Sequence, residues 1–309
     1  MIINWYPGHM ASAKRMMEEN LRIIDAVIML LDARIPYSSR NPDLDKMLQK
    51  SNKQVLVVLN KADLADPEMT KHWLKEFTSK GFDALAVNGA GKSRNEILSA
   101  LDRLTAPVRE KAAARGMKKT VRVLVAGIPN VGKSTLINTL AGKTRAKTGD
   151  KAGVTRGKQW ISINNYLELL DSPGLLWPRL DNQTAAKRLA FVGSVNDEIT
   201  DKEELALELV KQISQSYPEH LVSRYGVAVL DEPIMTYEAI CRKRGLLLKG
   251  NEPDWLRGAV MLIDEFRSGK IGRMTFDLPF ALLKNGGIPT DNSPSATPAL
   301  ASTKEDQNG

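Results

Sequence analysis

The first half of the chain alternates short apolar runs with amphipathic stretches. The runs at residues 23–31 and 121–126 are almost entirely apolar, which is typical of strands buried on both faces of a parallel sheet. The stretch at 67–80 is predicted to be a helix, with Asp66 as an N-cap before it and Gly81 as a stop after it. This alternation predicts an α/β fold whose ligands bind at the carboxyl ends of the strands.

The pattern also predicts where the individual elements lie. Strands are expected at 23–31, 54–59, 84–87 and 121–126 and as a hairpin of 158–163 with 166–170; helices are expected at 11–22, 43–50, 67–80, 96–113 with a break near Pro107, and 135–140. After Pro178 the pattern is helical, at 182–194, 197–215, 217–225, 232–244 and 253–268, with one further strand at 272–276. We therefore predict an α/β domain over 1–178, a small all-α domain over 179–284 and a disordered tail over 285–309.

Composition adds a charge argument to this picture. The chain has 309 residues, of which 42% are hydrophobic and 26% charged, as in ordinary globular proteins, but its formal net charge is +8. This excess of Lys and Arg favours an anionic partner, either a nucleic acid or a membrane surface. A basic protein without such a partner is the alternative.

Cysteine content and the N-terminal residues bear on the compartment. Cys241 is the only cysteine, which excludes an internal disulfide and a cysteine metal cluster and fits a reducing environment. The N-terminal residues lack the charged and apolar blocks of a signal peptide, and no apolar run reaches membrane-spanning length. We expect a cytoplasmic monomer without stable membrane association.

A phosphate-binding loop follows the apolar run at 121–126. Residues 127–134 read Gly-Ile-Pro-Asn-Val-Gly-Lys-Ser and match the G-x-x-x-x-G-K-S pattern in full. Backbone N–H groups of such a loop wrap a di- or triphosphate, Lys133 reaches the β and γ oxygens as a catalytic group, and Ser134 ligates Mg²⁺. The nucleotide-binding residues expected from this motif are Asn130, Val131, Gly132, Lys133, Ser134 and Thr135.

A second motif, Asn60-Lys61-Ala62-Asp63, specifies the base. The Asp63 carboxylate can accept two hydrogen bonds, from guanine N1–H and from the exocyclic amine, a pair that adenine cannot supply. Asn60 would tie this motif to the phosphate loop, and the stem of Lys61 would cover the face of the ring. Asn88 and Gly89 follow the third strand, where a backbone N–H could contact guanine O6. The expected ligands are GTP and GDP.

A third motif, Asp-x-x-Gly at 171–174, supplies the metal site. Asp171 offers a carboxylate to the Mg²⁺ shell, and the N–H of Gly174 can sense the γ-phosphate. Thr155 is the candidate for a second hydroxyl on Mg²⁺, with Thr144 and Thr148 as alternatives.

The order of these motifs is unusual. The base motif at 60–63 precedes the phosphate loop at 127–134, whereas ordinary small GTPases have the phosphate loop first. The same sheet can then be built only by circular permutation. Together with WYPGHM at 5–10, DARIP at 32–36 and DSPGLLWP at 171–178, this order resembles the circularly permuted ribosome-biogenesis GTPases of the YlqF/RbgA family.

The resemblance implies a P-loop GTPase that assembles the large (50S) ribosomal subunit. Such a factor binds the precursor particle, with its rRNA and ribosomal proteins, in the GTP state and leaves after hydrolysis. It also implies that the all-α domain binds RNA or the ribosome. Basic residues at 109–119 and 242–244 are candidate RNA contacts, although a solvated helix face explains either run equally well. A GTPase of RNA modification or membrane signalling and a non-hydrolysing GTP-binding adaptor remain as alternatives.

The catalytic group is not evident from the motifs alone. Leu175 occupies the position after Gly174 where Ras-like enzymes have a water-orienting glutamine, and an apolar side chain cannot orient water. His9 is the catalytic candidate, because the N-terminal segment should lie near the second switch and the resemblance points to it too. A structural turn is the alternative for His9. Asn130 is similar to a residue of GTPases in which bound K⁺ neutralises transition-state charge.

Overall fold

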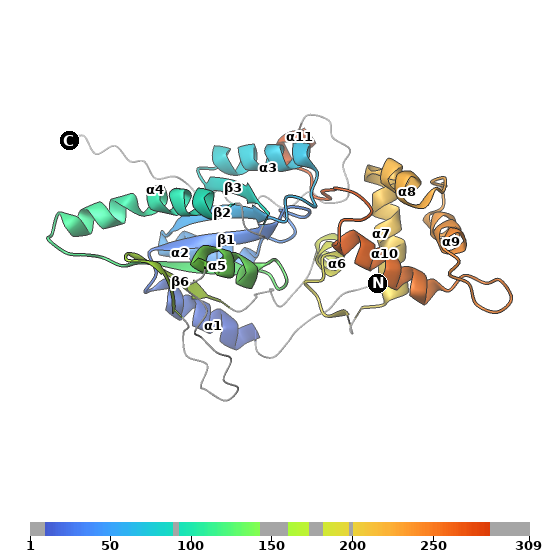
Figure 1. Cartoon of the computed structure of the whole chain (residues 1–309). Coiled ribbons are helices and arrows are strands. Elements are labelled where there is room, and N and C mark those ends of the chain that lie inside the picture. Colours follow the sequence, from blue (N-terminus) through green and yellow to red (C-terminus); the bar gives the residue numbers. More distant parts are fainter. Residues whose placement is uncertain (1–9, 89–92, 143–159, 173–181, 198–199, 285–309) are drawn as a thin grey trace.

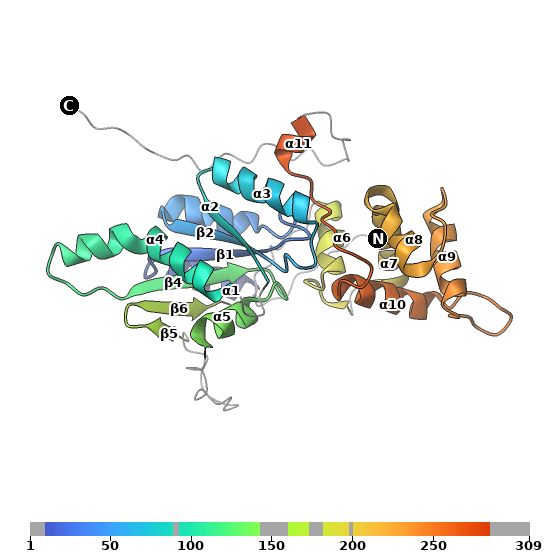
Figure 2. The same ribbon diagram turned by 45° about the horizontal axis from the view of Figure 1, so that its top comes forward.

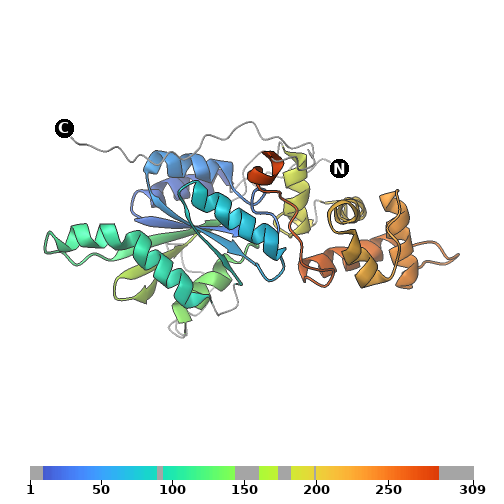
Figure 3. The ribbon, with the colours of Figure 1, turned by 90° about the horizontal axis from the view of Figure 1, so that it is seen from above.

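The computed structural model describes residues 10–88, 93–142, 160–172, 182–197 and 200–284, with side chains from residue 15 onward, and the description below concerns these residues. They form a six-stranded sheet with helices packed around it and a separate group of helices beside it (Figure 1). The same two bodies are seen after the molecule is turned (Figures 2 and 3). The predicted tail at 285–309 lies outside the described residues.

The sheet is built around β1 (Ala26–Asp32), which lies between β2 (Gln54–Asn60) and β4 (Val121–Gly127). The strand order is β3-β2-β1-β4-β6-β5, and every neighbouring pair is parallel except β5 with β6. All residues of β1 are buried, as its unbroken apolar sequence predicts for a central parallel strand. This confirms the predicted, mostly parallel α/β sheet.

The remaining strands are β3 (Asp83–Val87), β5 (Trp160–Asn164) and β6 (Leu167–Asp171). β5 and β6 form the predicted antiparallel hairpin. The predicted start of the first strand at residue 23 is wrong, because pairing begins only at Ala26. Just before it, the carboxylate of Asp25 accepts from the backbone N–H of Arg122 and pairs with Lys119 at 2.6 Å, which fixes the strand edge through a side chain.

The sheet shows directly that the chain is permuted. β1 and β2 precede β4 by more than sixty residues in the sequence, yet β1 lies between β2 and β4 in the sheet. Ala26 of β1 is opposite Gln54 of β2 on one side and opposite Val123 of β4 on the other. The carboxyl ends of β1, β2 and β4 therefore meet at one edge of the sheet. These ends carry the base motif and the phosphate loop.

Five helices pack around the sheet. Among the described residues, two side-chain caps are found on them, since Asn41 and Asp66 accept hydrogen bonds from the first-turn N–H groups of their helices. The five helices are α1 (Met10–Leu21), α2 (Pro42–Ser51), α3 (Pro67–Ser79), α4 (Arg94–Ala113) and α5 (Lys133–Ala141).

The predicted break near Pro107 is wrong, because α4 runs through this residue without interruption. Pro107 is exposed, and so is Arg103, whose carbonyl loses its helical N–H partner. Arg109 also reaches back and donates to the carbonyl of Asp102 at 3.0 Å. The exposure of Pro107 lowers the cost of proline in the helix, because water can replace the lost hydrogen bond.

The second body consists of helices arranged around α7. Its buried side chains include Leu205, Leu209 and Ile213, and the other helices pack against them. These predicted helices are confirmed, but the predicted start at 197 is wrong, because the Asp201 side chain caps α7 and the helix begins only at Lys202. The five helices are α6 (Gln183–Phe191), α7 (Lys202–Ser216), α8 (Pro218–Tyr225), α9 (Pro233–Lys243) and α10 (Trp255–Arg267). We call them the helical group.

The chain then returns to the sheet through residues 271–284, which we call the strap. The predicted strand at 272–276 is wrong: the segment is extended, but its N–H groups bond to loop carbonyls rather than to a strand, with Met274 donating to Leu64 and Phe276 to Arg34. The strap ends in α11 (Phe280–Lys284), where the Phe280 ring packs edge-on against Trp73. The strap belongs to the range predicted as all-α, yet it packs on the α/β body; the 178/179 division itself remains a prediction.

Candidate nucleotide-binding site

The turn from β4 into α5 forms the predicted phosphate loop. Gly132 adopts a φ of +101°, in the left-handed region, and a Cβ at this position would collide with the side-chain amide of Asn60. α5 begins at Lys133 without a side-chain cap, so the N–H groups of its first turn are available to an anion. Ser134 and Thr135 are exposed in this turn. The loop therefore has the geometry that binds phosphate.

Lys133 lies inside the loop with only 8% of its surface exposed. Its Nζ donates to the carbonyls of Ile128 at 2.8 Å and Gly127 at 3.2 Å. Burial lowers the pKa of Lys133 to about 8, although the Asp171 carboxylate acts in the opposite direction. A phosphate in the loop would offer this ammonium group charged oxygens in place of neutral carbonyls.

The base motif is tied to the phosphate loop as the sequence predicts. The Asn60 side-chain amide donates to the carbonyl of Val131 at 2.7 Å. Lys61 Nζ donates to the carbonyl of Asn130 at 2.8 Å. Lys61 and Asn130 both have positive φ, of 59° and 56°, which is uncommon for residues with side chains and is typical of functional loops. Two hydrogen bonds thus join the base motif to the phosphate loop, about seventy residues away in the sequence. Asp63, the last residue of the base motif, is exposed.

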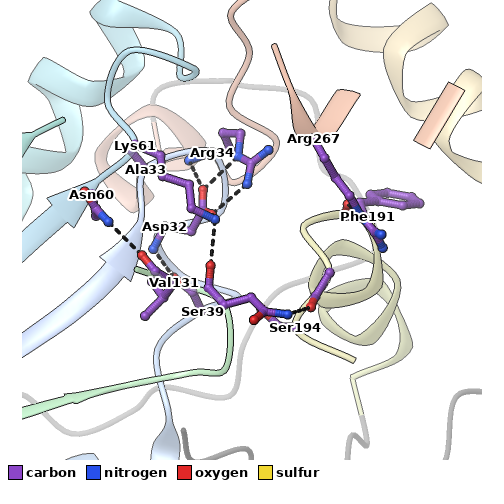
Figure 4. A network of polar contacts seen from close by, with 12 residues as sticks. Asp32, Ala33, Arg34, Ser39, Asn60, Lys61, Val131, Phe191, Ser194 and Arg267 are labelled. Carbon is purple, nitrogen blue, oxygen red and sulfur yellow. Dashed lines mark hydrogen bonds and ion pairs between the residues drawn. The ribbon is translucent and has the colours of Figure 1, made fainter. Parts of the chain in front are cut away.

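A buried charge cluster lies beneath this contact (Figure 4). The Asp32 carboxylate accepts from Arg34 at 2.9 and 2.8 Å and from the ammonium group of Lys61 at 3.1 Å. Burial alone raises the pKa of Asp32, but the charges and hydrogen bonds of Arg34 and Lys61 outweigh it and hold that pKa well below its usual range. Burial lowers the pKa of Lys61, while Asp32 opposes this shift. Asp32 therefore fixes the side chain of Lys61.

The helical group contacts the phosphate loop directly. The Asn130 amide donates to the carbonyl of Gly193 at 2.5 Å, and the Ser194 hydroxyl donates to the carbonyl of Pro129 at 2.8 Å. Both partners follow α6, whose end is held by Arg267, which donates to the carbonyls of Phe191 and Ala190. Two hydrogen bonds therefore join the phosphate loop to the segment that follows α6.

The other predicted site residues fall into two groups. Asp171 lies at the end of β6, close enough to Lys133 to raise the pKa of that lysine. Asn88 is exposed and follows β3. His9, Gly89, Thr155 and Gly174 lie outside the described residues. Ser134 and Asp171 offer oxygen atoms beside the phosphate loop, which is the donor type that Mg²⁺ prefers.

Parts of both basic runs have structural partners. In the first run, Arg109 pairs with Asp102 at 2.7 Å and lies over the ring of Tyr166. In the second, Arg242 pairs with Glu238 and Arg244 lies over the ring of Tyr225. These residues support the fold, so the runs do not by themselves indicate an RNA surface.

Sequence reasoning missed the role of Asp32 and Arg34. Asp32 ends β1 directly opposite Asn60, the first residue of the base motif. A parallel pairing of the first two predicted strands, aligned at their polar ends, could have placed these residues side by side. The contact of Gly193 and Ser194 with the phosphate loop had no comparable signal, because it joins two bodies whose relative position the sequence does not encode locally.

Comparison with known proteins agrees with this geometry. Residues 122–226 match a family model described as 50S ribosome-binding GTPase. Ribosome biogenesis GTPase A of Bacillus cereus is 44% identical over 282 residues, which cover 90% of this chain and 95% of the relative. The chain belongs to the ribosome biogenesis GTPase A family, also named YlqF/RbgA. It is therefore a GTPase.

Solved structures of this family bind guanine nucleotides. GNP-bound YlqF from T. maritima superposes with a TM-score of 0.62 at 30% identity, covering 87% of this chain and 98% of that one. A GDP-bound structure of TM YlqF gives a TM-score of 0.63 at 29% identity, covering 86% and 100%. Guanine-nucleotide binding and a permuted P-loop fold are thus established for the family.

Within the described ranges, every helix is too short or too polar to span a bilayer.

Proposed function

We propose that this GTPase binds a precursor of the large ribosomal subunit in its GTP state, hydrolyses GTP there and then leaves. Two hydrogen bonds carry this proposal: Asn130 of the phosphate loop donates to the Gly193 carbonyl after α6, and the Ser194 hydroxyl donates to a carbonyl of the phosphate loop. Through these contacts, a nucleotide bound in the phosphate loop can influence the position of the helical group. The relatives named as ribosome biogenesis factors supply the class of particle. The protein acts in the cytoplasm as a monomer.

The site residues have separate roles in this proposal. Asp63 reads the guanine edge, Asn88 and Gly89 line the base pocket, and the loop from Asn130 to Thr135 wraps the phosphates. Gly174 senses the γ-phosphate through its backbone N–H.

Metal ions complete the proposed site. Ser134, Asp171 and Thr155 would hold Mg²⁺, which when bound neutralises charge on the β and γ phosphates. Asn130 is the candidate ligand of K⁺. Its side-chain N–H donates to the Gly193 carbonyl in this structure, so its side-chain oxygen is the atom that could face a cation.

Hydrolysis requires a group that orients water, since Leu175 cannot do so. His9 is the proposed group. It directly precedes α1 in the sequence, in the N-terminal segment that leads into β1. Lys133 stabilises the charge that develops on the phosphate oxygens.

Single-turnover hydrolysis of GTP tests the proposal, with and without purified precursor particles. Stimulation of the wild type by particles, lost in His9→Ala at unchanged GTP affinity, is the expected result. Equal rates with and without particles contradict the ribosomal function, and equal rates in wild type and variant contradict the role of His9.

A further inference from the structure

A cleft of about 550 Å³ lies between α1 and α2, away from the nucleotide site. Its lining includes Leu21 and Arg22, which lie a few residues before β1, and Lys53, which directly precedes β2. The nucleotide site lies at the opposite, carboxyl ends of these strands, roughly 20 Å away for strands of this length. The cleft is therefore a separate feature of the α/β body.

The rim of the cleft is basic. The lining has four cationic side chains and two carboxylates. The cations are Arg22, Lys46, Lys50 and Lys53, and the carboxylates are those of Glu18 and Asp43. In the described part of the chain, none of these four cations is in an ion pair, whereas Lys61, Lys80, Lys119 and Arg188 are. Lys53 is half-buried and donates to the carbonyl of Ile24 at 2.7 Å, which fixes its stem at the end of the cleft. The helix dipole of α2 explains a lysine at position 50, in the last turn, but not at position 46.

The floor of the cleft is apolar. Leu21 and Met47 lie there, with 5% and 9% of their surfaces exposed. An apolar floor with a cationic rim suits a ligand that has flat or apolar groups on one side and phosphates on the other. Nucleic acid has this chemistry, because bases and sugars alternate with charged phosphates along its length.

The arrangement favours a polymer over a single nucleotide. Lys46 and Lys50 are exposed and lie one turn apart on α2, with their Cβ atoms about 5–6 Å apart, so both ammonium groups can contact successive phosphates of one strand. A small anion would instead require enclosed polar groups to replace its hydration. We propose that the cleft between α1 and α2 binds a single-stranded segment of RNA through its phosphate backbone. This inference rests on the proposed function, since the ribosomal particle supplies the RNA.

The test compares full-length wild type with K46E/K50E in binding a fluorescein-labelled single-stranded RNA oligonucleotide, followed by anisotropy at several salt concentrations. The plot of log affinity against log salt should become shallower by about 1.4 for two lost phosphate contacts at about 0.7 each. K46R/K50R should bind as the wild type does. The matched control is K71E/K75E, which changes the same charge at the same spacing on α3.

The outcomes separate this inference from the proposed function. Absence of RNA binding by the wild type, equal binding by K46E/K50E, or equal weakening in K71E/K75E would each overturn the cleft as an RNA site. GTP affinity and the urea unfolding midpoint should be the same in all variants. If K46E/K50E still co-sediments with particles and is stimulated as the wild type is, the cleft is refuted while the ribosomal function stands. If the wild type itself is not stimulated, the proposed function fails.

Discussion

Asp32 shows how single residues hold the site together. Its carboxylate is 1% exposed and compensates two cations, Arg34 at 2% and Lys61 at 24% side-chain exposure. Such a cluster adds little net stability compared with apolar residues, but losing one member is costly because the remaining charges stay buried. Lys61, which also contacts the phosphate loop, then loses the group that positions it.

Replacing Asp32 by Asn should therefore destabilise the protein by about 3–5 kcal/mol, because Arg34 is left buried without a counter-charge. Urea unfolding at neutral pH measures this change. The control is Glu68→Gln, which breaks the exposed pair with Lys71 and should cost less than about 0.5 kcal/mol. Similar losses in both variants would show that the cluster has no special role.

We predict that Lys133 makes nucleotide affinity depend on pH. Its pKa is about 8 in the nucleotide-free protein, so its charge is lost as the pH rises through this value. Bound phosphates stabilise the ammonium group and raise its pKa, so affinity for GDP should be constant below about pH 7 and fall by up to about tenfold per pH unit above 8. Fluorescence titration of GDP on both sides of this pH provides the measurement. Lys133→Met should bind weakly, with no such fall; a flat wild-type profile refutes the assignment.

At the scale of elements, the strap links three parts of the molecule. The buried Asp277 carboxylate accepts from the backbone N–H and hydroxyl of Ser38, at 2.6 and 2.7 Å, and from Arg188 of α6 at 2.6 Å. Trp73 of α3 donates its ring N–H to the carbonyl of Asp277. One acidic residue thus joins the α/β body, the strap and the helical group.

Asp277→Asn should lower the free energy of unfolding by about 3 kcal/mol and expose the strap to proteolysis, because Arg188 loses its charged partner in a buried setting. Urea unfolding and limited proteolysis followed by mass spectrometry check both effects. Asp231→Asn, at an exposed position, should change neither. If the strap is cut no faster in Asp277→Asn, another contact holds it.

The sequence predicted the regular elements better than the connections between them. Buried parallel strands such as β1 and the β5–β6 hairpin have strong local patterns, and Asn41 and Asp66 mark their helices. The sequence misled at Pro107, where exposure to solvent lets α4 accommodate proline. It also misled in the strap, where a segment with alternating apolar residues bonds to loops instead of a strand. Both outcomes depend on surroundings that no local window contains.

Within the site, predictability followed the same rule. The tie between Asn60 and the phosphate loop could be predicted because both motifs are recognisable by themselves. The Asp32–Arg34 pair and the Gly193 carbonyl could not, since their importance arises only when separate strands and bodies come together.

In the whole molecule, the permutation places the phosphate loop before the helical group in the sequence. The segment that follows α6 forms hydrogen bonds with this loop. Because Asn130 and Ser194 join these parts, nucleotide binding and particle binding should be thermodynamically coupled, and each should change the affinity of the other by the same factor.

Ser194→Ala should reduce this coupling while leaving nucleotide affinity within about twofold, because the lost hydroxyl contacts a loop carbonyl rather than the ligand. Co-sedimentation with particles in GDP and in a GTP analogue measures the ratio of affinities, which should fall by about fivefold. Ser268→Ala is the matched control, since that hydroxyl only bonds within its own helix end. An unchanged ratio in Ser194→Ala would exclude this route of coupling.

In the proposed site, Asp63 and Lys133, from separate halves of the chain, bind opposite ends of one guanine nucleotide. The most direct measurement compares GTP with XTP in wild type and Asp63→Asn. Xanthine has an oxygen where guanine has its amine, so it matches an amide donor in place of a carboxylate. Wild type should prefer GTP by at least about a hundredfold, and the variant should prefer XTP. If both proteins bind GTP and XTP with the same preference, Asp63 does not read the base, which contradicts the proposed site.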